Sequence, residues 1–284
     1  MSAVALVLNP QRAEAADLAL EVADVLGADG HEVRLTTAHA ELIGRDALGF
    51  GDDDLLDGLD LAVSLGGDGT MLWTVELVAA AGTPVLGVNL GSLGYLTEVE
   101  PSGALEGIKR CLAGDHTIEE RLLLAVEIDE RDGSTRSLRL SMNEIVVEKA
   151  PLGQIVRLSV SFDGRPFTTY AADGLIVATP TGSTAYSLSA RGPIVDPTHR
   201  ALVMTPVAPH MLFDRSLVLS PDTTVEIEVH GRPAIVAADG HRVADLADGD
   251  VVRCRAADVP ARLVRLGDTD FHETLKAKFG LEDR

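Results

Sequence analysis

The order of apolar segments along the chain is the feature that most limits its fold. In the N-terminal part, short strand-like runs alternate with patterns of helical period. The strand-like runs cover residues 3–8, 33–36, 61–65 and 84–89, and the helical patterns cover residues 13–26 and 70–80. This alternation is typical of a parallel sheet covered by helices, with ligands outside the carboxyl ends of the strands. We therefore predict an α/β domain over residues 1–118.

The pattern changes near residue 119, where strand-like runs follow one another across turn signals. Asp-Gly pairs and related tight turns between such runs indicate β-hairpins. The runs cover residues 122–129, 137–148, 155–162, 165–170, 225–229, 234–238 and 251–255. We predict a mostly antiparallel, β-rich domain over residues 119–268, followed by a C-terminal segment, 269–284, whose helix at 270–279 packs back on the first domain.

Charge and cysteine content exclude several classes of function. The 284 residues carry 24 Lys and Arg against 44 Asp and Glu, a net charge of −20. A polyanion repels nucleic acids and anionic membranes, so neither is an expected partner. Cys111 and Cys254 are far apart and lack any C-x-x-C spacing, so no disulfide framework and no metal-ligating set is predicted. Without a signal-like N-terminus or a membrane-spanning apolar run, the chain is expected in the cytoplasm.

A glycine-rich turn lies between the strand at 61–65 and the helix that follows it: Gly66, Gly67, Asp68, Gly69 and Thr70. Backbone N–H groups of such a turn can approach a polyphosphate closely, and the positive end of the helix dipole favours it. The turn is neither a Walker loop nor G-x-G-x-x-G. A simple turn is the alternative, since the chain has eight Asp-Gly pairs, but three glycines around one acid exceed what a turn needs. Asp68 could accept the proton of an attacking hydroxyl.

A second polar block runs from Asp173 to Ser189, with an apolar strand ending in Thr-Pro-Thr-Gly and six hydroxyl side chains over residues 181–189. Hydroxyls and N–H groups at a helix N-terminus suit amide, ribose and phosphate oxygens, although helix capping alone would explain one of them. A third feature is the pair Asn143-Glu144, which interrupts a strand-like run. It could clamp a ribose diol or an adenine edge, or simply mark a strand bend.

Together, the three segments resemble the NAD kinase family. The hallmarks of that family are the GGDGT turn, an Asn-Glu pair and a long glycine-rich block, and they are matched here at 66–70, 143–144 and 173–186. The turn by itself is shared with lipid kinases and, more loosely, with phosphofructokinases. The long block makes the match specific, and the resemblance extends over roughly residues 60 to 245.

The resemblance implies an activity and a role for each residue of the site. It implies transfer of a phosphoryl group from ATP, or from polyphosphate, to the 2′-hydroxyl of the adenosine ribose of NAD, with Mg²⁺ as cofactor. Asp68 corresponds to the catalytic base, and the phosphates are expected at Gly66, Gly67 and Thr70. The NAD-binding residues implied are Gly69, Tyr95, Asn143, Glu144, Asp173, Thr184, Ala185, Tyr186 and Ser189.

The family also implies an architecture and an assembly. It combines a Rossmann-like α/β half with a β-rich half, and it forms dimers and tetramers in which a neighbouring subunit completes the site. Pro209-His210 resembles the family segment directed toward that neighbour, although His210 could also be a satisfied interface or core histidine. The chain departs from the family at Trp73, where many members carry a basic or polar side chain, so neutralisation of phosphates near the turn depends more on Mg²⁺.

Two other functions share part of the pattern. A lipid kinase would use the same GGDGT turn, but it should have an apolar channel and often a basic membrane-facing patch. The net charge of −20 and the polar block at 181–189 disfavour it. A non-catalytic dinucleotide-binding regulator could lose the base without cost, so the presence of Asp68 disfavours that alternative.

Overall fold

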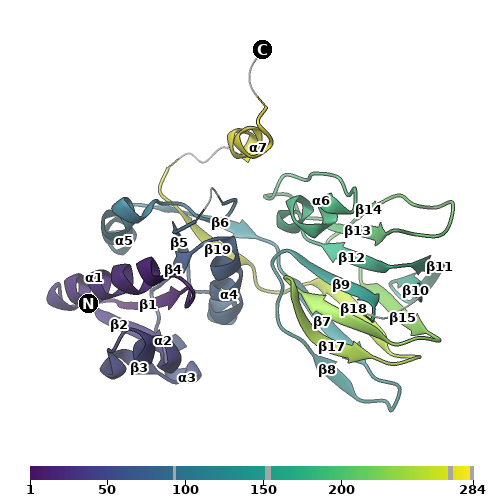
Figure 1. Cartoon of the computed structure of the whole chain (residues 1–284), viewed down its shortest axis with the longest axis horizontal. Helices are drawn as coiled ribbons and strands as arrows, with labels where there is room; N and C mark the ends of the chain where they lie inside the picture. Colours follow the sequence, from purple (N-terminus) through teal and green to yellow (C-terminus); the bar gives the residue numbers. More distant parts are fainter. Residues whose placement is uncertain (92–93, 151–154, 268–270, 282–284) are drawn as a thin grey trace. The chain divides into compact units, whose positions relative to one another are not determined.

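The structure is a computed structural model that describes residues 1–91, 94–150, 155–267 and 271–281. The chain forms two compact units (Figure 1). The first comprises Met1–Glu120 and Ala261–Arg284, and the second comprises Arg121–Pro260. The predicted fold class, an α/β half followed by a mostly antiparallel β half, is confirmed.

The first unit is built on one seven-stranded sheet of order β3-β2-β1-β4-β5-β19-β6. Its strands are β1 (Ala3–Leu8), β2 (Glu32–Thr36), β3 (Gly49–Phe50), β4 (Leu61–Gly66), β5 (Val85–Asn89), β6 (Thr117–Arg121) and β19 (Ala261–Arg265). The pairs from β3 to β19 are parallel. Strand order reverses between β1 and β4, and in open α/β sheets such a reversal leaves a crevice at the carboxyl ends of the two strands.

Helices cover both faces of this sheet. On one face lie α1 (Ala13–Ala28) and α5 (Ala104–Leu112), which share a core with Leu6 and Leu65. Side chains alternate along a strand, so Gly66 and Gly87 face the other way. They meet Thr70 and Met71 of α4 (Asp68–Val78), which places α4 on the opposite face (Figure 1). The predicted helix at 70–80 therefore begins two residues earlier, at Asp68.

The remaining helical elements of this unit are short or peripheral. They are α2 (Thr37–Leu42), α3 (Asp52–Leu56), α7 (Phe271–Phe279) and the 3₁₀ turns η1 (Asp46–Leu48), η2 (Ala79–Ala81) and η3 (Pro101–Gly103). The predicted C-terminal helix corresponds to α7, and Asp270 lies outside the described residues. Lys278 Nζ of α7 lies 4.9 Å from the centre of the Tyr95 ring. This cation–π contact joins the helix to the first unit.

The second unit is a sandwich of two antiparallel sheets. One has the order β11-β10-β15-β18-β7-β8 and the other β14-β13-β12-β9-β16-β17. The first contains β7 (Leu124–Asp129), β8 (Thr135–Ser137), β10 (Val156–Phe162), β11 (Arg165–Ala172), β15 (Val225–His230) and β18 (Val251–Ala256). The second contains β9 (Glu144–Lys149), β12 (Gly174–Ala178), β13 (Leu202–Val207), β14 (Leu217–Leu219), β16 (Ala234–Ala238) and β17 (His241–Leu246). Alternate side chains of both sheets interlock in one core around Tyr170 and Leu175.

The structure corrects three boundaries expected from sequence. The strand expected at 137–148 is broken, because β8 belongs to one sheet and β9 to the other, and residues 138–143 cross between them. Residues 261–265 form β19, which pairs with β5 rather than with the β-rich unit. The helix expected after the Thr-Pro-Thr-Gly turn is a 3₁₀ turn, η4 (Thr181–Thr184), and a four-residue helix, α6 (Tyr186–Ser189), separated at the non-helical Ala185.

Candidate active site

In the first unit, the carboxylate of Asp68 is held by backbone amides at the start of α4. Tyr95 N lies 3.1 Å from Oδ1 and 3.0 Å from Oδ2 of Asp68, and Leu96 N lies 3.1 Å from Oδ1. A Cβ at Gly94 would stand 2.4 Å from Oδ1, so only glycine lets this loop reach the carboxylate. Two amides use part of the accepting capacity of the carboxylate, which leaves room for another hydrogen bond.

The glycines of the GGDGT turn have different structural roles. A Cβ at Gly66 would lie 2.1 Å from Thr70 Oγ1, so Gly66 is required for α4 to pack on β4. A Cβ at Gly67 or Gly69 would meet nothing within 4 Å. Gly67 has φ −116°, and Gly69 is not among the residues of positive φ. Neither internal packing nor backbone conformation therefore requires glycine at 67 or 69, and both positions keep the backbone accessible from outside.

Backbone angles separate this turn from the ordinary Asp-Gly turns of the chain. Six of the eight Asp-Gly pairs have a glycine in the left-handed region, which is common in hairpin turns and after helix C-termini. These six glycines are Gly30, Gly58, Gly133, Gly164, Gly240 and Gly249. The two exceptions, Gly69 and Gly174, belong to two of the three motifs on which the functional prediction rests. The simple-turn alternative therefore does not describe Asp68-Gly69.

In the second unit, the Asn143-Glu144 pair is organised by a residue that the sequence reasoning missed. The Asp239 carboxylate accepts hydrogen bonds from the backbone N–H groups of Met142 (2.8 Å), Asn143 (2.8 Å) and Glu144 (3.1 Å), and from the Ser141 hydroxyl. Asp239 lies in the β16–β17 turn with φ +46°. Only its Asp-Gly pair signalled it in the sequence, and that pair indicates a hairpin rather than a carboxylate cap.

Glu144 itself is a buried acid. Its side chain is 5% exposed, and Oε2 has no hydrogen-bond partner among the described residues. Burial raises the pKa of Glu144 to about 7, and the negative charge of Asp239 adds to the shift, while the backbone N–H of Tyr186 opposes it. A partly protonated, under-satisfied carboxyl is suited to polar groups of a ligand that can complete its hydrogen bonds.

The hydroxyl-rich block divides into internal and accessible groups. Four hydroxyls serve the fold: those of Thr179, Thr181, Ser183 and Ser187, bonded respectively to Met142 O (2.6 Å), Arg121 Nη1 (3.1 Å), Val195 N (3.0 Å) and Thr205 Oγ1 (3.1 Å). Over residues 181–189, the positions that are not buried are Thr184, Ala185, Tyr186, Leu188 and Ser189, and the Thr184 hydroxyl also donates to Thr181 O at 3.2 Å. The hydroxyls of this block are therefore divided between internal hydrogen bonds and the surface. Four of the five positions that are not buried are those that the family resemblance implies.

Gly182 fixes the block against Asn143. A Cβ at Gly182 would lie 2.0 Å from Asn143 O, and Thr179 N donates to the same oxygen at 2.9 Å. The Asn-Glu pair and the glycine-rich block are thus one continuous surface at the end of β12. Asp173 stands at the start of β12, where Lys149 Nζ lies 2.6 Å from its Oδ1.

Tyr186 connects the two ends of that surface. Burial raises the pKa of Tyr186, and the charges of Glu148, Asp173 and Glu144 raise it further. Tyr186 is 40% exposed, so its side chain remains accessible from outside. The expected NAD-binding residues of the second unit therefore cluster around α6. Asp68, Gly69 and Tyr95 form a separate group in the first unit.

Two further residues singled out in the sequence have simple surroundings. Trp73 is 36% exposed on α4 and packs edge-on against the buried His39 ring at 5.1 Å. Burial lowers the pKa of His39 and so disfavours its charged form. Trp73 therefore provides packing, and the pair supplies no positive charge near the turn. His210 is exposed, and its backbone N–H donates to Ala171 O at 2.7 Å. His210 is therefore not a core histidine.

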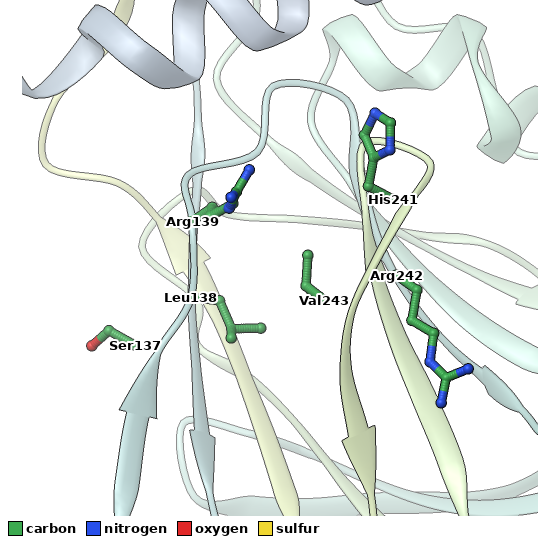
Figure 2. Close-up of a pocket in the computed structure, with 6 residues that line it drawn as sticks. All are labelled: Ser137, Leu138, Arg139, His241, Arg242 and Val243. Carbon is green, nitrogen blue, oxygen red and sulfur yellow. The ribbon is translucent and has the colours of Figure 1, made fainter. Parts of the chain in front are cut away.

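A cavity of about 500 Å³ lies beside the Asp239 turn in the second unit. It is lined by Ser137, Leu138, Arg139, His241, Arg242 and Val243. Figure 2 shows Leu138 and Val243 at its centre, with Arg139 and His241 toward one end and Arg242 directed away. Arg242 forms an ion pair with Asp245. None of the predicted site residues lines this cavity.

Comparison with known proteins identifies the family to which the chain belongs. The family model described as the ATP-NAD kinase N-terminal domain matches residues 4–116, and the one described as the ATP-NAD kinase C-terminal domain matches residues 142–266. An NAD kinase of Symbiobacterium thermophilum is 41% identical over 98% of this chain and 99% of its own length. One of Moorella thermoacetica is 38% identical over 98% of this chain and 89% of its own. The chain belongs to the NAD kinase family.

Solved structures give the same result for the fold. The crystal structure of yeast NADH kinase complexed with NADH superimposes with a TM-score of 0.91 at 26% identity, over 100% of this chain and 89% of that one. An NAD kinase from Archaeoglobus fulgidus in complex with ATP gives a TM-score of 0.73 at 25% identity, over 98% of this chain and 97% of that one. Members of this family are phosphotransferases, and this chain is an enzyme of that kind.

Proposed function

We propose that this enzyme transfers the γ-phosphoryl group of ATP to the 2′-hydroxyl of the adenosine ribose of NAD. The hydroxyl oxygen bonds to the γ-phosphorus, the bond from that phosphorus to the bridging oxygen breaks, and ADP leaves. Asp68 accepts the hydroxyl proton. Two observations carry the proposal. Backbone amides hold the Asp68 carboxylate in place, and neither packing nor backbone conformation requires glycine at positions 67 and 69 beside it.

Acceptor recognition is assigned to the surface around α6. Glu144 and Asn143 would take the ribose and adenine, with Thr184, Ala185, Tyr186 and Ser189 along the accessible edge and Asp173 at its far end. The under-satisfied Glu144 carboxyl supports this assignment: Glu144 is 5% exposed, and a ribose hydroxyl that reached Oε2 would supply its missing hydrogen bond. In the first unit, Gly69 and Tyr95 would contact NAD, and Gly66, Gly67 and Thr70 the phosphates.

We also propose Mg²⁺ as the cofactor. The described residues contain no group of three His, Cys, Asp or Glu that could hold a metal. Mg²⁺ fits such a protein, because it is usually held by one or two carboxylates together with substrate phosphates rather than by an all-protein cage. When bound, it neutralises charge on the donor phosphates.

The assembly proposed is a homodimer or homotetramer. An aromatic cluster at the surface of the second unit supports it: the Phe167 ring lies 5.1 Å from that of Phe162 and 5.8 Å from that of Phe213. The adjacent Leu212 is fully exposed. Contiguous exposed apolar groups of this kind mark interaction surfaces. Sedimentation velocity of the parent chain and of Leu212→Glu tests this, since a monomer in both cases would rule the assembly out.

The cytoplasm is proposed as the location. Cys111 and Cys254 are free and buried, which suits a reducing compartment. No helix within the described part of the chain is long and apolar enough to cross a membrane.

The proposed reaction is tested by measuring NADP from NAD with ATP, with inorganic polyphosphate, and without any donor. ATP should give NADP, and removal of Mg²⁺ by a chelator should abolish its formation. A control with diacylglycerol or sphingosine as acceptor covers the lipid kinase alternative. If ATP is not consumed when NAD is present, or if the lipid is the better acceptor, the proposal is wrong.

A further inference from the structure

The phosphate-binding turn carries no positive side chain of its own. From Gly66 to Val78 the sequence contains no Lys or Arg, and Asp68 adds a negative charge. The chain as a whole has a net charge of −20. A triphosphate at this turn therefore needs a cation from another segment, in addition to any metal that it brings.

Arg12 stands at the place where such a cation is needed. It follows β1, the strand next to β4, and the two strands flank the point where strand order reverses. The Arg12 guanidinium donates through Nη1 to the carbonyl oxygen of Leu90. Leu90 in turn donates its N–H to Gly66 O at 2.7 Å. Arg12 is thus anchored to the residue that is hydrogen-bonded to the first glycine of the turn.

The surrounding backbone makes space for this guanidinium. A Cβ at Gly91 would lie 3.3 Å from Arg12 Nη2, so a larger residue there would crowd the side chain. Gly91 N is itself held by Asn89 Oδ1 at 3.1 Å, and Asn89 Nδ2 bonds to Glu100 Oε1 at 3.1 Å. The end of β5 is therefore fixed in a conformation that leaves room beside Leu90.

Most of the donors of Arg12 remain available. A guanidinium carries five N–H donors, and only the bond to Leu90 O uses one of them within the described residues. Arg12 is exposed, and it forms no ion pair with any described carboxylate in a chain that has 44 of them. A fork of N–H groups that is fixed at one end and accessible at the other is suited to phosphate oxygens.

We propose that Arg12 binds the phosphate chain of the donor at the GGDGT turn and supplies the positive charge that the turn lacks. The proposal rests on the proposed function and deepens it by naming the residue that recognises the donor. The chemistry recognised is a chain of phosphates, whether it belongs to a nucleoside triphosphate or to inorganic polyphosphate.

The test compares Arg12→Ala with Arg45→Ala, an exposed arginine of the same unit whose Nη2 lies 2.7 Å from Asp24. Arg12→Ala should raise the KM for ATP about ten- to a hundredfold and leave the KM for NAD nearly unchanged. Arg12→Lys should lie between the parent and the alanine variant, because it keeps the charge but loses the fork. Arg45→Ala should behave as the parent.

Inorganic tripolyphosphate separates phosphate recognition from a structural role. It should inhibit the parent competitively with ATP, and Arg12→Ala should weaken that inhibition by the same factor as the KM for ATP. If Arg12→Ala leaves both unchanged, or changes the KM for NAD and ATP equally with a loss of thermal stability, the inference is overturned.

Tripolyphosphate also distinguishes a failure of the Arg12 proposal from a failure of the proposed function. Calorimetric titration with tripolyphosphate needs no turnover. If the parent forms no NADP but binds tripolyphosphate, and Arg12→Ala does not bind it, then Arg12 is an anion-binding residue and only the proposed function fails. If the parent forms NADP and the alanine variant binds tripolyphosphate equally well, only the role of Arg12 fails.

Discussion

The carboxylate of Asp239 accepts the backbone N–H of Glu144 at 3.1 Å, while its negative charge contributes to the raised pKa of the Glu144 side chain. One group therefore fixes the backbone of the acid and disfavours its ionised form. This contact links the β16–β17 turn to the start of β9. Substitution of either residue should therefore change a measurable property of the protein.

Asp239→Asn should loosen the turn at residues 142–144. An amide has one accepting oxygen in place of two, so at least one of the backbone N–H groups now bound to Asp239 loses its partner. Asparagine tolerates the left-handed backbone of this position, so the backbone itself is not strained. We expect a loss of about 1–3 kcal/mol in unfolding free energy and a higher KM for NAD. Denaturant unfolding and steady-state kinetics measure the two effects.

The matched control for that variant is Asp245→Asn, on the neighbouring strand β17. Its carboxylate is 73% exposed and pairs with Arg242, so its loss should cost little. Equal effects of the two substitutions on stability and on the KM for NAD would contradict the role given to Asp239.

Glu144→Gln should change how stability depends on pH. The pKa of Glu144 is raised from 4.5 to about 7, so the folded chain binds this proton more tightly than the unfolded chain does. That contribution is fully present below pH 4.5 and is lost as pH rises toward 7, and glutamine removes the dependence. Between pH 4.5 and 8, the stability of the variant should rise relative to the parent by up to about 3 kcal/mol.

Urea unfolding of both proteins across this pH range gives the comparison, since all other titrating groups are common to them. Glu148→Gln, on the same strand and less buried, serves as the control. A constant difference between the parent and Glu144→Gln would show that Glu144 has an ordinary pKa.

Asp68→Asn should retain the fold and lose most of the turnover. The amide oxygen can still accept from Tyr95 N or Leu96 N, but it cannot take up a hydroxyl proton. General bases contribute roughly 10²–10⁴-fold, so kcat should fall by that factor with little change in the KM for NAD. Asp60→Asn is the control, because Asp60 Oδ2 also accepts a backbone N–H, from Ala3 at 2.8 Å. Undiminished kcat in folded Asp68→Asn would reject the base.

Much of the fold could be predicted from sequence because burial follows local periodicity. Apolar runs and Asp-Gly turns predict four parallel strands of the first unit, β1, β2, β4 and β5, and most hairpins of the second unit. The change of sheet at residues 138–143 could not, since each half of the segment has a normal strand pattern. The same holds for β19, whose partner β5 lies far away in the chain.

The candidate site was predictable to the extent that its motifs are contiguous. Asp68, Glu144 and Tyr186 come from short segments of distinctive composition. Asp239 contacts one of those segments from a distant turn, and Arg12 is linked to the GGDGT turn only through Leu90, so their roles depend on which oxygen or N–H they meet in three dimensions. Composition gives no signal for such a contact, so these two residues could be found only in the structure.

Gly69→Ala tests directly whether the glycine-rich turn is designed for a ligand or for the fold. Gly69 lies in the first turn of α4, is exposed, and has neither a positive φ nor any atom within 4 Å of an added Cβ. Alanine is a better helix former than glycine, so the variant should be as stable as the parent or more stable, by up to about 1 kcal/mol. The same methyl group would stand where NAD is expected to approach, so the KM for NAD should rise about tenfold or more. Gly27→Ala is the matched control, since Gly27 is an exposed glycine within α1 whose added Cβ also meets nothing. It should give a similar change in stability and unaltered kinetics. Normal kinetics in both variants would show that glycine at position 69 is not needed for substrate binding. The contact assigned between Gly69 and NAD would then be wrong.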